Sequence, residues 1–336
     1  MRNIYSVKYS EFKKHIMGQG YPGFHADNVF RWIYSRRVKD FSSMTDIPLS
    51  LRSYLNDNFE FRLPEVVDKR TGPDGTTKFL MRLEDGETVE SVLIPEKGHY
   101  TFCISSQIGC KMGCKFCATG ASGFVRNLKH FEITGQILRL LENVDDRVNI
   151  VFMGMGEPLD NPDEVSMSIE VMRDWVGISP RKITLSTVGL VDQLEPLLKK
   201  FPNLRIALSL NFASEEKRTE FMPINKKYPI KRIIKVLGEL PIKRRDRITI
   251  EYVLIEGIND SEKDALALGN LIKGLKVKIN LIPYNENEFF PWKSPSYEKV
   301  EKFASILRGM KYSVFVRFSK GNEIKAACGQ LRAQRG

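Results

Sequence analysis

Four of the five cysteines in this 336-residue chain lie close together, at positions 103, 110, 114 and 117. Cys110, Cys114 and Cys117 have the spacing C-x3-C-x2-C, on a segment that also contains three glycines. Three thiolates on a compact loop can hold three irons of a [4Fe-4S] cluster and leave the fourth iron open to another ligand. A structural zinc ion is the alternative, but it needs four ligands, and none of the four histidines stands at a clear fourth position. The spacing therefore favours an iron–sulfur cluster.

Cys103 and Cys328 remain once the triplet is assigned. Cys103 stands seven residues before Cys110, and Cys328 lies in AACGQL near the C-terminus. A single free cysteine is most often a small buried hydrophobe, but two such thiols near one reactive site are harder to explain in this way. The odd number of cysteines argues against a disulfide framework, so metal binding or thiol chemistry is the expected use.

The elements that must position these cysteines repeat as strand, loop and helix from residue 99 onward. The candidate strands are HYTFCIS, RVNIVFM, KITLST, LRIALSL, RITIEYVL and VKINLIP. A seventh, YSVFVRF, follows the last long helix. Six such units predict an α/β fold with a parallel sheet that is either curled into an incomplete barrel or left open.

Chemistry in β/α barrels collects at the carboxyl ends of the strands. The cysteine loop follows the first candidate strand, and MGMGEP, which contains Gly156 and Glu157, follows the second. Other residues end or follow the later strands, namely Ser186, Ser209, Leu210, Asn211 and Asn285. Each of them alone is more often a strand-end cap, and a Gly-rich loop alone is usually a turn. Together they are expected around one mouth of the barrel.

The first 60 residues predict a small basic helical domain, because PGFHADNVFRWIYSRR carries apolar residues at helical spacing and a further helix runs to about Phe59. Its aromatic residues could stack on bases, but their helical spacing is more typical of a core. TTKFLMRL and ETVESVLI then alternate like strands around a Gly-containing turn. The expected division is a helical accessory domain (1–60), a linking β-hairpin with Glu90 (61–95), and a core with the Cys328 segment (96–336).

The chain is basic, with 52 lysines and arginines against 41 acidic residues. This excess favours a polyanionic partner, with nucleic acid as the first candidate, although a generally basic soluble surface is the plain alternative. The C-terminal stretch is particularly basic and could contact phosphates: it contains Arg308, Lys311, Arg317, Lys320, Lys325, Arg332 and Arg335. No apolar segment approaches the length of a membrane span, so we expect a cytoplasmic protein.

The cysteine triplet is also the signature of radical S-adenosylmethionine (SAM) enzymes, which the chain resembles from about residue 96 to its end. The resemblance implies a partial (β/α)6 barrel that binds a [4Fe-4S] cluster and SAM. In that superfamily the amino and carboxylate groups of SAM chelate the open iron, and one electron cleaves the sulfonium to give a radical. Gly156 and Glu157 would then offer backbone groups and a carboxylate to the ammonium of SAM.

A series of motifs in order along the whole chain narrows the resemblance to one family. They are VESVLIP with Glu90, CISSQIGCKMGCKFCATG, GFVRNL, FMGMGEPLDN, STVGL, MPINKKYPI, EYVLIEGIND, NLIPYN and AACGQL. They resemble the RlmN/Cfr family of radical SAM RNA methyltransferases. The resemblance implies methylation of adenine C2 in 23S rRNA, at the peptidyl-transferase centre, and in tRNA. It also implies an RNA contact for the helical domain, an electron donor such as flavodoxin, and a monomeric enzyme.

The resemblance assigns roles to the cysteines outside the triplet. Cys328 would take a methyl group from one SAM, and a radical made from a second SAM would activate that S-methyl group to add to the base. Release of the RNA would need Glu90 to remove the C2 proton and Cys103 to attack the Cys328 sulfur, forming a transient disulfide. Without the family context, Glu90 would more often be a surface glutamate on a strand.

Ser186, Ser209, Leu210, Asn211 and Asn285 match family positions that contact SAM. One departure is visible, because the family usually has Ser-Leu-His where this chain has Ser209-Leu210-Asn211. Asparagine can donate a hydrogen bond but does not titrate near neutrality. A proton-transfer role at position 211 is therefore in doubt, whereas a binding role survives.

Two alternatives remain open. The related Cfr enzymes methylate C8 of the same adenine with the same cysteines, although ESVLIP, GEP and NLIPYN favour C2. A zinc-bearing RNA-binding protein without catalysis would explain the charge and the cysteine loop, but it leaves Cys328 and the strand-end residues unexplained.

Overall fold

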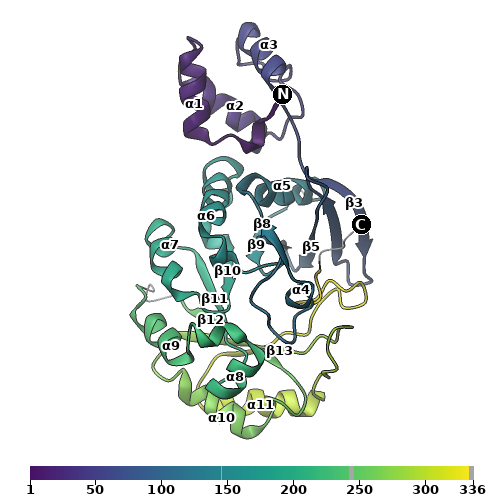
Figure 1. Cartoon of the computed structure of the whole chain (residues 1–336), viewed down its shortest axis with the longest axis vertical. Helices are drawn as coiled ribbons and strands as arrows, with labels where there is room; N and C mark the ends of the chain where they lie inside the picture. Colours follow the sequence, from purple (N-terminus) through teal and green to yellow (C-terminus); the bar gives the residue numbers. More distant parts are fainter. Residues whose placement is uncertain (145, 242–245, 333–336) are drawn as a thin grey trace.

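Ten strands form one sheet within residues 1–144, 146–241 and 246–332, the parts of the chain that the computed structural model describes (Figure 1). The strands follow one another in the order β14-β13-β12-β11-β10-β9-β6-β5-β4-β3. From β14 to β6 all neighbours are parallel, whereas β5, β4 and β3 continue the same sheet in antiparallel fashion. The fold is therefore a mixed α/β fold with a parallel barrel-like portion.

The parallel strands confirm the six predicted units and the seventh strand. They are β6 (His99–Cys103), β9 (Val148–Phe152), β10 (Ile183–Thr187), β11 (Arg205–Ser209), β12 (Ile248–Leu254), β13 (Val277–Pro283) and β14 (Val314–Val316). Their apolar side chains are almost all buried, as expected where helices cover one face of a parallel sheet. All of these strands point their carboxyl ends toward the same edge.

Helices connect the parallel strands and pack on the outside of the sheet (Figure 1). They are α5 (His130–Leu141), α6 (Pro162–Val171), α7 (Leu194–Lys200), α8 (Glu215–Phe221), α9 (Ile230–Glu239), α10 (Glu262–Leu271) and α11 (Tyr297–Gly309). Local sequence sets several of their starts: Ser261 and Asp264 form a capping box on α10, and Ser296 caps α11. One hydrophobic core joins the sheet to these helices.

An antiparallel meander precedes the parallel strands. It consists of β3 (Glu65–Thr71), β4 (Thr77–Arg82) and β5 (Thr88–Glu96). The predicted hairpin is β4 and β5, and Gly86 adopts a φ of 88° in its turn. The sequence analysis missed β3, because this edge strand is mostly exposed and lacks an apolar alternation. Since β5 pairs with β6, the segment assigned as a link continues the main sheet.

The N-terminal residues form a separate helical cluster at the top of Figure 1. It contains α1 (Tyr9–Gly18), α2 (Phe24–Phe30), a π-helical turn (Arg31–Ser35) and α3 (Leu49–Asn58), with β1 (Arg2–Asn3) paired to β2 (Phe59–Glu60). Most of its aromatic residues are buried in this cluster, although Phe24 is exposed. Trp175 of the barrel packs against Tyr9 and Phe30 and fixes the two parts to each other.

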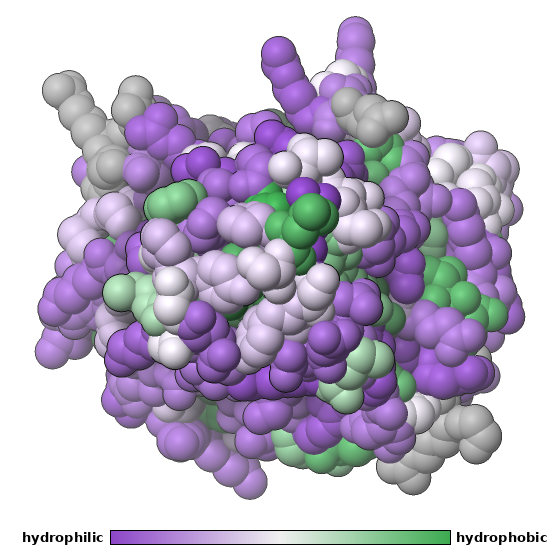
Figure 2. All heavy atoms as spheres, turned by 90° about the horizontal axis from the view of Figure 1, so that it is seen from above, coloured by the Kyte–Doolittle hydropathy of each residue, from purple (hydrophilic) through white to green (hydrophobic). Residues whose placement is uncertain are grey.

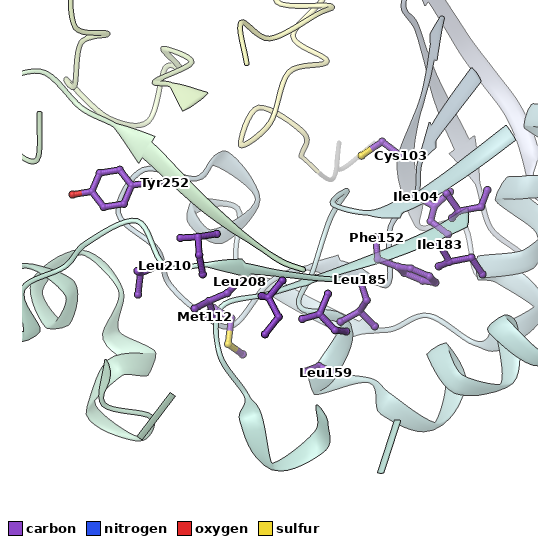
Figure 3. Packing of buried hydrophobic residues seen from close by; sticks show 14 of the residues in the cluster. Cys103, Ile104, Met112, Phe152, Leu159, Ile183, Leu185, Leu208, Leu210 and Tyr252 are labelled. Atoms are coloured by element: carbon purple, nitrogen blue, oxygen red, sulfur yellow. The ribbon is translucent and has the colours of Figure 1, made fainter. Parts of the chain in front are cut away.

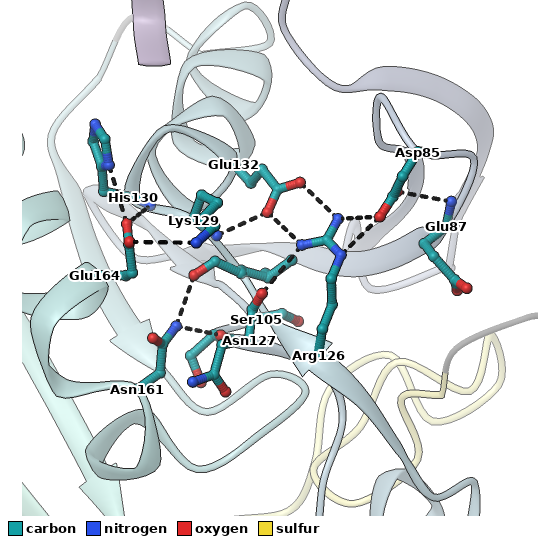
Figure 4. A network of polar contacts seen from close by, with 12 residues as sticks. Asp85, Glu87, Ser105, Arg126, Asn127, Lys129, His130, Glu132, Asn161 and Glu164 are labelled. Atoms are coloured by element: carbon teal, nitrogen blue, oxygen red, sulfur yellow. Dashed lines mark hydrogen bonds and ion pairs between the residues drawn. The ribbon is translucent and has the colours of Figure 1, made fainter. Parts of the chain in front are cut away.

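A polar network fixes the end of the cysteine loop (Figure 4). Arg126, on β8 (Phe124–Asn127), donates two hydrogen bonds of 2.8 Å to the buried Glu132 of α5. Its Nε donates to Asp85 in the β4–β5 turn at 2.7 Å. These carboxylates, Glu132 first, raise the pKa of Arg126. The GFVRNL motif therefore ties the cysteine loop to a helix and to the hairpin.

The end of the molecule seen in Figure 2 is covered mainly by hydrophilic side chains, with small separate hydrophobic areas. Within the described residues, none of the helices has both the length and the apolar character that crossing a bilayer requires.

Candidate active site

A cavity lies at the carboxyl ends of the parallel strands, and the space in it, including the part open to solvent, is about 990 Å³. Ten of the thirteen predicted site residues line it: Cys110, Cys114, Cys117, Gly156, Glu157, Ser186, Ser209, Asn211, Asn285 and Cys328. The structure thus brings the cysteine loop, four strand ends and the C-terminal segment to one space.

The cysteine loop runs between β7 (Gln107–Gly109) and β8, with the short helix α4 (Ala118–Ala121) directly after Cys117. Gly109 has a φ of 73°, and a Cβ there would lie 1.8 Å from the carbonyl oxygen of Gly123. The loop can therefore close only with glycine at this position. The Cys110 N–H also donates to Gly123 O at 2.9 Å and holds the two ends of the loop together.

The environment of the three thiols suits them to bind a cationic centre. Burial raises the pKa of Cys110 to about 12 and that of Cys114 well above its usual value, and the neighbouring cysteines add to both shifts. Three thiolates in this space therefore need positive charge beside them. Among the described residues, no three histidine, cysteine or acidic side chains are gathered closely enough to hold a single metal ion. Three thiolates from one short loop match the three irons of a [4Fe-4S] cluster that take protein ligands, whereas a tetrahedral zinc ion would need a fourth ligand.

The loop after β9 packs very closely against Ser105 and Gln107, which precede the cysteine loop. A Cβ on Gly154 would lie 2.6 Å from Ser105 Oγ, and one on Gly156 would lie 2.6 Å from Gln107 Cβ. Gly156 also has a φ of 100°, which side chains rarely tolerate. The glycines of MGMGEP are therefore required by packing, and they leave backbone groups at the cavity surface.

Glu157 presents a buried carboxylate to the cavity. Its Oε2 accepts a hydrogen bond from the Val188 N–H at 2.8 Å, and its Oε1 accepts one from the Leu159 N–H at 3.1 Å. Burial nevertheless raises the pKa of Glu157 to about 7. A ligand ammonium beside it would favour the ionised form, so this residue fits the predicted contact with an amino group.

The ends of β10 and β11 meet beside Glu157. The hydroxyls of Ser186 and Ser209 lie 3.2 Å apart, and both line the cavity. Asn211 has a φ of 59°, a conformation that asparagine tolerates better than most residues. Its Oδ1 accepts the Val253 N–H at 3.1 Å, while its amide makes only a weak contact with Met222 Sδ at 3.7 Å. That amide can still donate to a ligand.

Leu210 does not line the cavity. Its side chain is fully buried in the apolar cluster drawn in Figure 3. Its carbonyl oxygen accepts a hydrogen bond of 3.2 Å from Nε of Arg218, a fully buried cation that also donates to the Val188 carbonyl. Any contribution of Leu210 to ligand binding must therefore come from its backbone.

The Cys328 segment closes one side of the cavity. The amide of Asn285 donates to the Cys328 carbonyl oxygen at 3.0 Å, and the Ala118 N–H donates to Gly329 O at 2.8 Å. The Cys328 thiol is exposed to the cavity, yet removal from bulk water raises its pKa to about 11, with Glu251 adding to the shift. The segment thus holds a free cysteine beside the cluster loop.

Cys103 and Glu90 lie behind this segment rather than on the cavity wall. Burial raises the pKa of Cys103, and the charge of Cys328 raises it further, which places the two thiols within electrostatic reach. Glu90 is 1% exposed, and its Oε2 accepts the Arg332 N–H at 3.0 Å. Both residues therefore face the segment that carries Cys328.

Glu251 is a cavity residue that the sequence analysis did not select. It lies in β12, where burial raises its pKa to about 7, and Asn280 donates to its Oε1 at 2.9 Å. A signal was present in the sequence, because a charged residue interrupts the otherwise apolar strand RITIEYVL. The strand pattern alone could not show that this position faces the cavity.

Comparison with known families gives two matches. Residues 104–268 match the family described as the radical SAM superfamily. Residues 2–61 match the ribosomal RNA large subunit methyltransferase N-terminal domain. The two matches correspond to the barrel and to the N-terminal helical cluster.

Whole-chain relatives agree with these matches. The chain is 45% identical to the dual-specificity RNA methyltransferase RlmN of Desulfosudis oleivorans, over 92% of this chain and 85% of the relative. It is 43% identical to a probable enzyme of the same name from Dictyoglomus thermophilum, over 99% and 97%. The crystal structure of a radical SAM methyltransferase from Sphaerobacter thermophilus superposes with a TM-score of 0.92 at 35% identity, over 99% of both chains.

Proposed function

Because this chain belongs to the RlmN family of radical SAM RNA methyltransferases, we propose that it methylates C2 of adenine in 23S rRNA, at the peptidyl-transferase centre, and in tRNA. One observation supports this most directly: the cysteine triplet and Cys328 line the same cavity. A cluster site beside a free cysteine is what a methyl-carrying thiol requires.

The cavity residues divide into two cofactor sites. Cys110, Cys114 and Cys117 would hold a [4Fe-4S] cluster, and a larger group would hold SAM: Gly156, Glu157, Ser186, Ser209, Asn211 and Asn285. Leu210, which does not line the cavity, could add only a backbone contact. When bound, the cluster and SAM supply a methyl group and one-electron chemistry. The buried carboxylate of Glu157 fits an ammonium, and the amide of Asn211 fits an acceptor.

Cys328 carries the methyl group in this proposal, as S-methylcysteine. Its thiol is exposed to the cavity, so a methyl donor held there can reach it. With a pKa of about 11 the thiol is largely protonated near neutrality, so a proton must leave before the sulfur can act as a nucleophile. After losing one hydrogen atom, the carbon attached to Cys328 would bond to C2 of the base while keeping its bond to sulfur, which tethers the RNA to the protein.

Release of the RNA uses Glu90 and Cys103. Glu90 is buried, and its Oε1 lies 2.9 Å from the ammonium of Lys78, so in this proposal the C2 proton goes to a carboxylate that is held in place by an ion pair. Cys103 would lose its proton and attack the Cys328 sulfur, so that a disulfide forms as the bond from Cys328 to the RNA carbon breaks. That carbon keeps the electron pair of the broken bond and takes up a proton, which leaves a methyl group on the base. The burial of Cys103 keeps it protonated until that step, because its pKa is raised.

The proposed test is an anaerobic assay of the reconstituted monomer with 23S rRNA fragments and with tRNA, followed by mass spectrometry of the nucleosides. Flavodoxin, the proposed electron donor, serves as the reductant, and dithionite serves as the control. We expect 2-methyladenosine from both RNAs. Formation of 8-methyladenosine would support the Cfr-like alternative. Modification of only one of the two RNAs would show that the other is not a substrate.

Metal analysis tests the alternative of another class. Anaerobically purified protein should contain iron and sulfide in equal amounts and show the brown colour of a cluster. A colourless protein with one zinc and no methylated product would remove the enzyme proposal.

A further inference from the structure

Lys78 shares one face of the sheet with two residues of the proposed release step. It lies opposite Val92 in the β4–β5 pairing, and Val92 lies opposite Cys103 in the β5–β6 pairing. Residues directly opposite each other on neighbouring strands point to the same face, as do residues two apart along one strand. Glu90, two positions before Val92, therefore shares this face with Lys78 and Cys103.

The ammonium of Lys78 links Glu90 to the C-terminal segment. Its Nζ lies 2.9 Å from Glu90 Oε1 and donates a hydrogen bond of 3.2 Å to the carbonyl oxygen of Lys325. The side chain of Lys78 is 10% exposed and that of Glu90 is 1% exposed. A buried cation and a buried carboxylate are tolerated only when each has the other beside it. The pair is thus a permanent feature of this face.

The pair holds the Cys328 segment on both sides of the cysteine. Lys78 binds the carbonyl of Lys325, three residues before Cys328. Glu90 Oε2 accepts the N–H of Arg332, four residues after it. Lys78 and Glu90 therefore hold the backbone of the segment before and after Cys328, although they lie far from it in the sequence.

We propose that Lys78 is a positioning residue that holds the Cys328 segment against the face carrying Glu90 and Cys103. The inference rests on the proposed function of these three residues. Removing the ammonium would free the segment at Lys325 and leave the Glu90 carboxylate buried without a counter-ion. Both changes would weaken the approach of Cys328 to Cys103.

Lys320 offers a matched control. Its Nζ donates to the Pro95 carbonyl at 2.5 Å and lies 3.4 Å from Glu96 Oε2. It therefore connects the same two parts of the chain, β5 and the C-terminal segment, as Lys78 does. It is much more exposed, and its charge partner is Glu96 rather than Glu90.

The test measures the Cys103–Cys328 disulfide in the full chain. Serine at positions 110, 114 and 117 leaves these as the only two of the five cysteines. Equilibration with reduced and oxidised glutathione, followed by mass spectrometry, gives the disulfide stability. Lys78→Met should lower the equilibrium constant roughly tenfold, because a hydrogen bond to a charged group is lost. Lys78→Arg should stay within about threefold and Lys320→Met within about twofold of the parent.

Two results would overturn the proposal. Lys78→Met equal to Lys320→Met would show that the ammonium does not position the thiols, and Lys78→Arg equal to Lys78→Met would show that side-chain shape, not charge, matters. Circular dichroism checks the fold, and Lys78→Gln, which also removes the charge, replaces Lys78→Met if that variant does not fold. A second readout is the rate of trypsin cleavage after Lys325 in the chain that keeps all five cysteines. This rate should be higher in Lys78→Met than in Lys320→Met. Neither measurement needs RNA, SAM or a cluster. The positioning role of Lys78 can therefore be contradicted by these measurements while the methylation assay still supports the proposed function.

Discussion

The two sides of the cavity are built by different kinds of contact. On the cofactor side, backbone N–H groups join neighbouring loops: the Gly154 N–H donates to Ile104 O, and the Val188 N–H donates to the Glu157 side chain. On the thiol side, the segment around Cys328 is held by side chains of Lys78 and Glu90, more than 240 residues earlier in the chain. The first side is an extension of the sheet, and the second is a terminal segment laid against it.

This difference separates the expected effects of substitution. Contacts between adjacent strand ends are supported by the whole sheet, so they preorganise a ligand site. A terminal segment held by a few side chains can be displaced without unfolding the sheet. Changes on the cofactor side should therefore abolish cofactor binding, whereas changes on the thiol side should alter the fate of the RNA with cofactors still bound.

Replacement of Cys114 should have the largest effect. Cys114→Ala removes one of three proposed ligands from a buried loop, so we expect nearly complete loss of iron and of all SAM-dependent chemistry. Iron and sulfide analysis after anaerobic reconstitution measures this. Cys328→Ala is the matched control from the other side of the cavity and should keep its iron. Full iron content in Cys114→Ala would show that Cys114 is not a ligand of the cluster, and it would contradict the assignment of this loop to the cofactor side.

Replacement of Cys103 should leave the cofactor side intact and stop the reaction late. In Cys103→Ala the proposed thiol that releases the RNA is absent, so a covalent protein–RNA adduct should accumulate to at most one per protein. Denaturing gels before and after nuclease treatment measure it. The double variant Cys103→Ala/Cys328→Ala should form no adduct, and Cys328→Ala alone should still cleave SAM. Normal product yield from Cys103→Ala would cancel the role assigned to Cys103.

The sequence predicted the cofactor side better than the thiol side for a physical reason. The cysteine spacing, the glycines of MGMGEP and the strand-end serines are local features whose meeting point follows from parallel strand topology. The partnership of Lys78 with Lys325 depends on strand register and on the path of the last segment, and neither has a local pattern. Leu210 shows a different limit of the sequence: a motif identifies the position, but it does not show that the side chain packs in the core and leaves only the backbone for a ligand.

Edge position and burial explain the remaining differences. β3 was missed because an exposed edge strand needs no apolar alternation. Glu251 was passed over because a strand pattern identifies buried positions but does not show which of them border a cavity. The parallel strands themselves were predictable, since their apolar runs are demanded by burial under the helices.

Arg218 tests how rigid the cofactor side is. Its guanidinium donates to the carbonyls of Leu210 and Val188 and to Asn225 Oδ1 at 2.6 Å. Arg218→Met should lower the free energy of unfolding by roughly 3–5 kcal/mol, because it leaves buried acceptors without a donor. Urea unfolding measures this. The exposed Arg173, paired with Asp174, is the control, and Arg173→Met should cost less than about 1 kcal/mol. Equal costs would mean that the loops do not depend on this cation.

The smallest expected effect is a dependence of stability on pH from the two buried cavity carboxylates. Burial raises the pKa of both Glu157 and Glu251 to about 7 in the folded protein. The folded state therefore binds these protons more tightly than the unfolded chain does. The stability they contribute is fully present below the ordinary glutamate pKa and is lost as the pH rises through about 7.

Acidification from about pH 8 to about pH 6 should thus stabilise the cofactor-free protein by about 1 kcal/mol for each carboxylate. Glu157→Gln and Glu251→Gln should each remove one such contribution, as measured by urea unfolding at both pH values. Addition of SAM should then affect the two pH-dependent contributions differently. Its ammonium, held beside Glu157, would keep that carboxylate ionised and abolish its contribution, whereas the contribution of Glu251, which acts on Cys328, should persist. Loss of both contributions on SAM binding would show that Glu251 also belongs to the cofactor side.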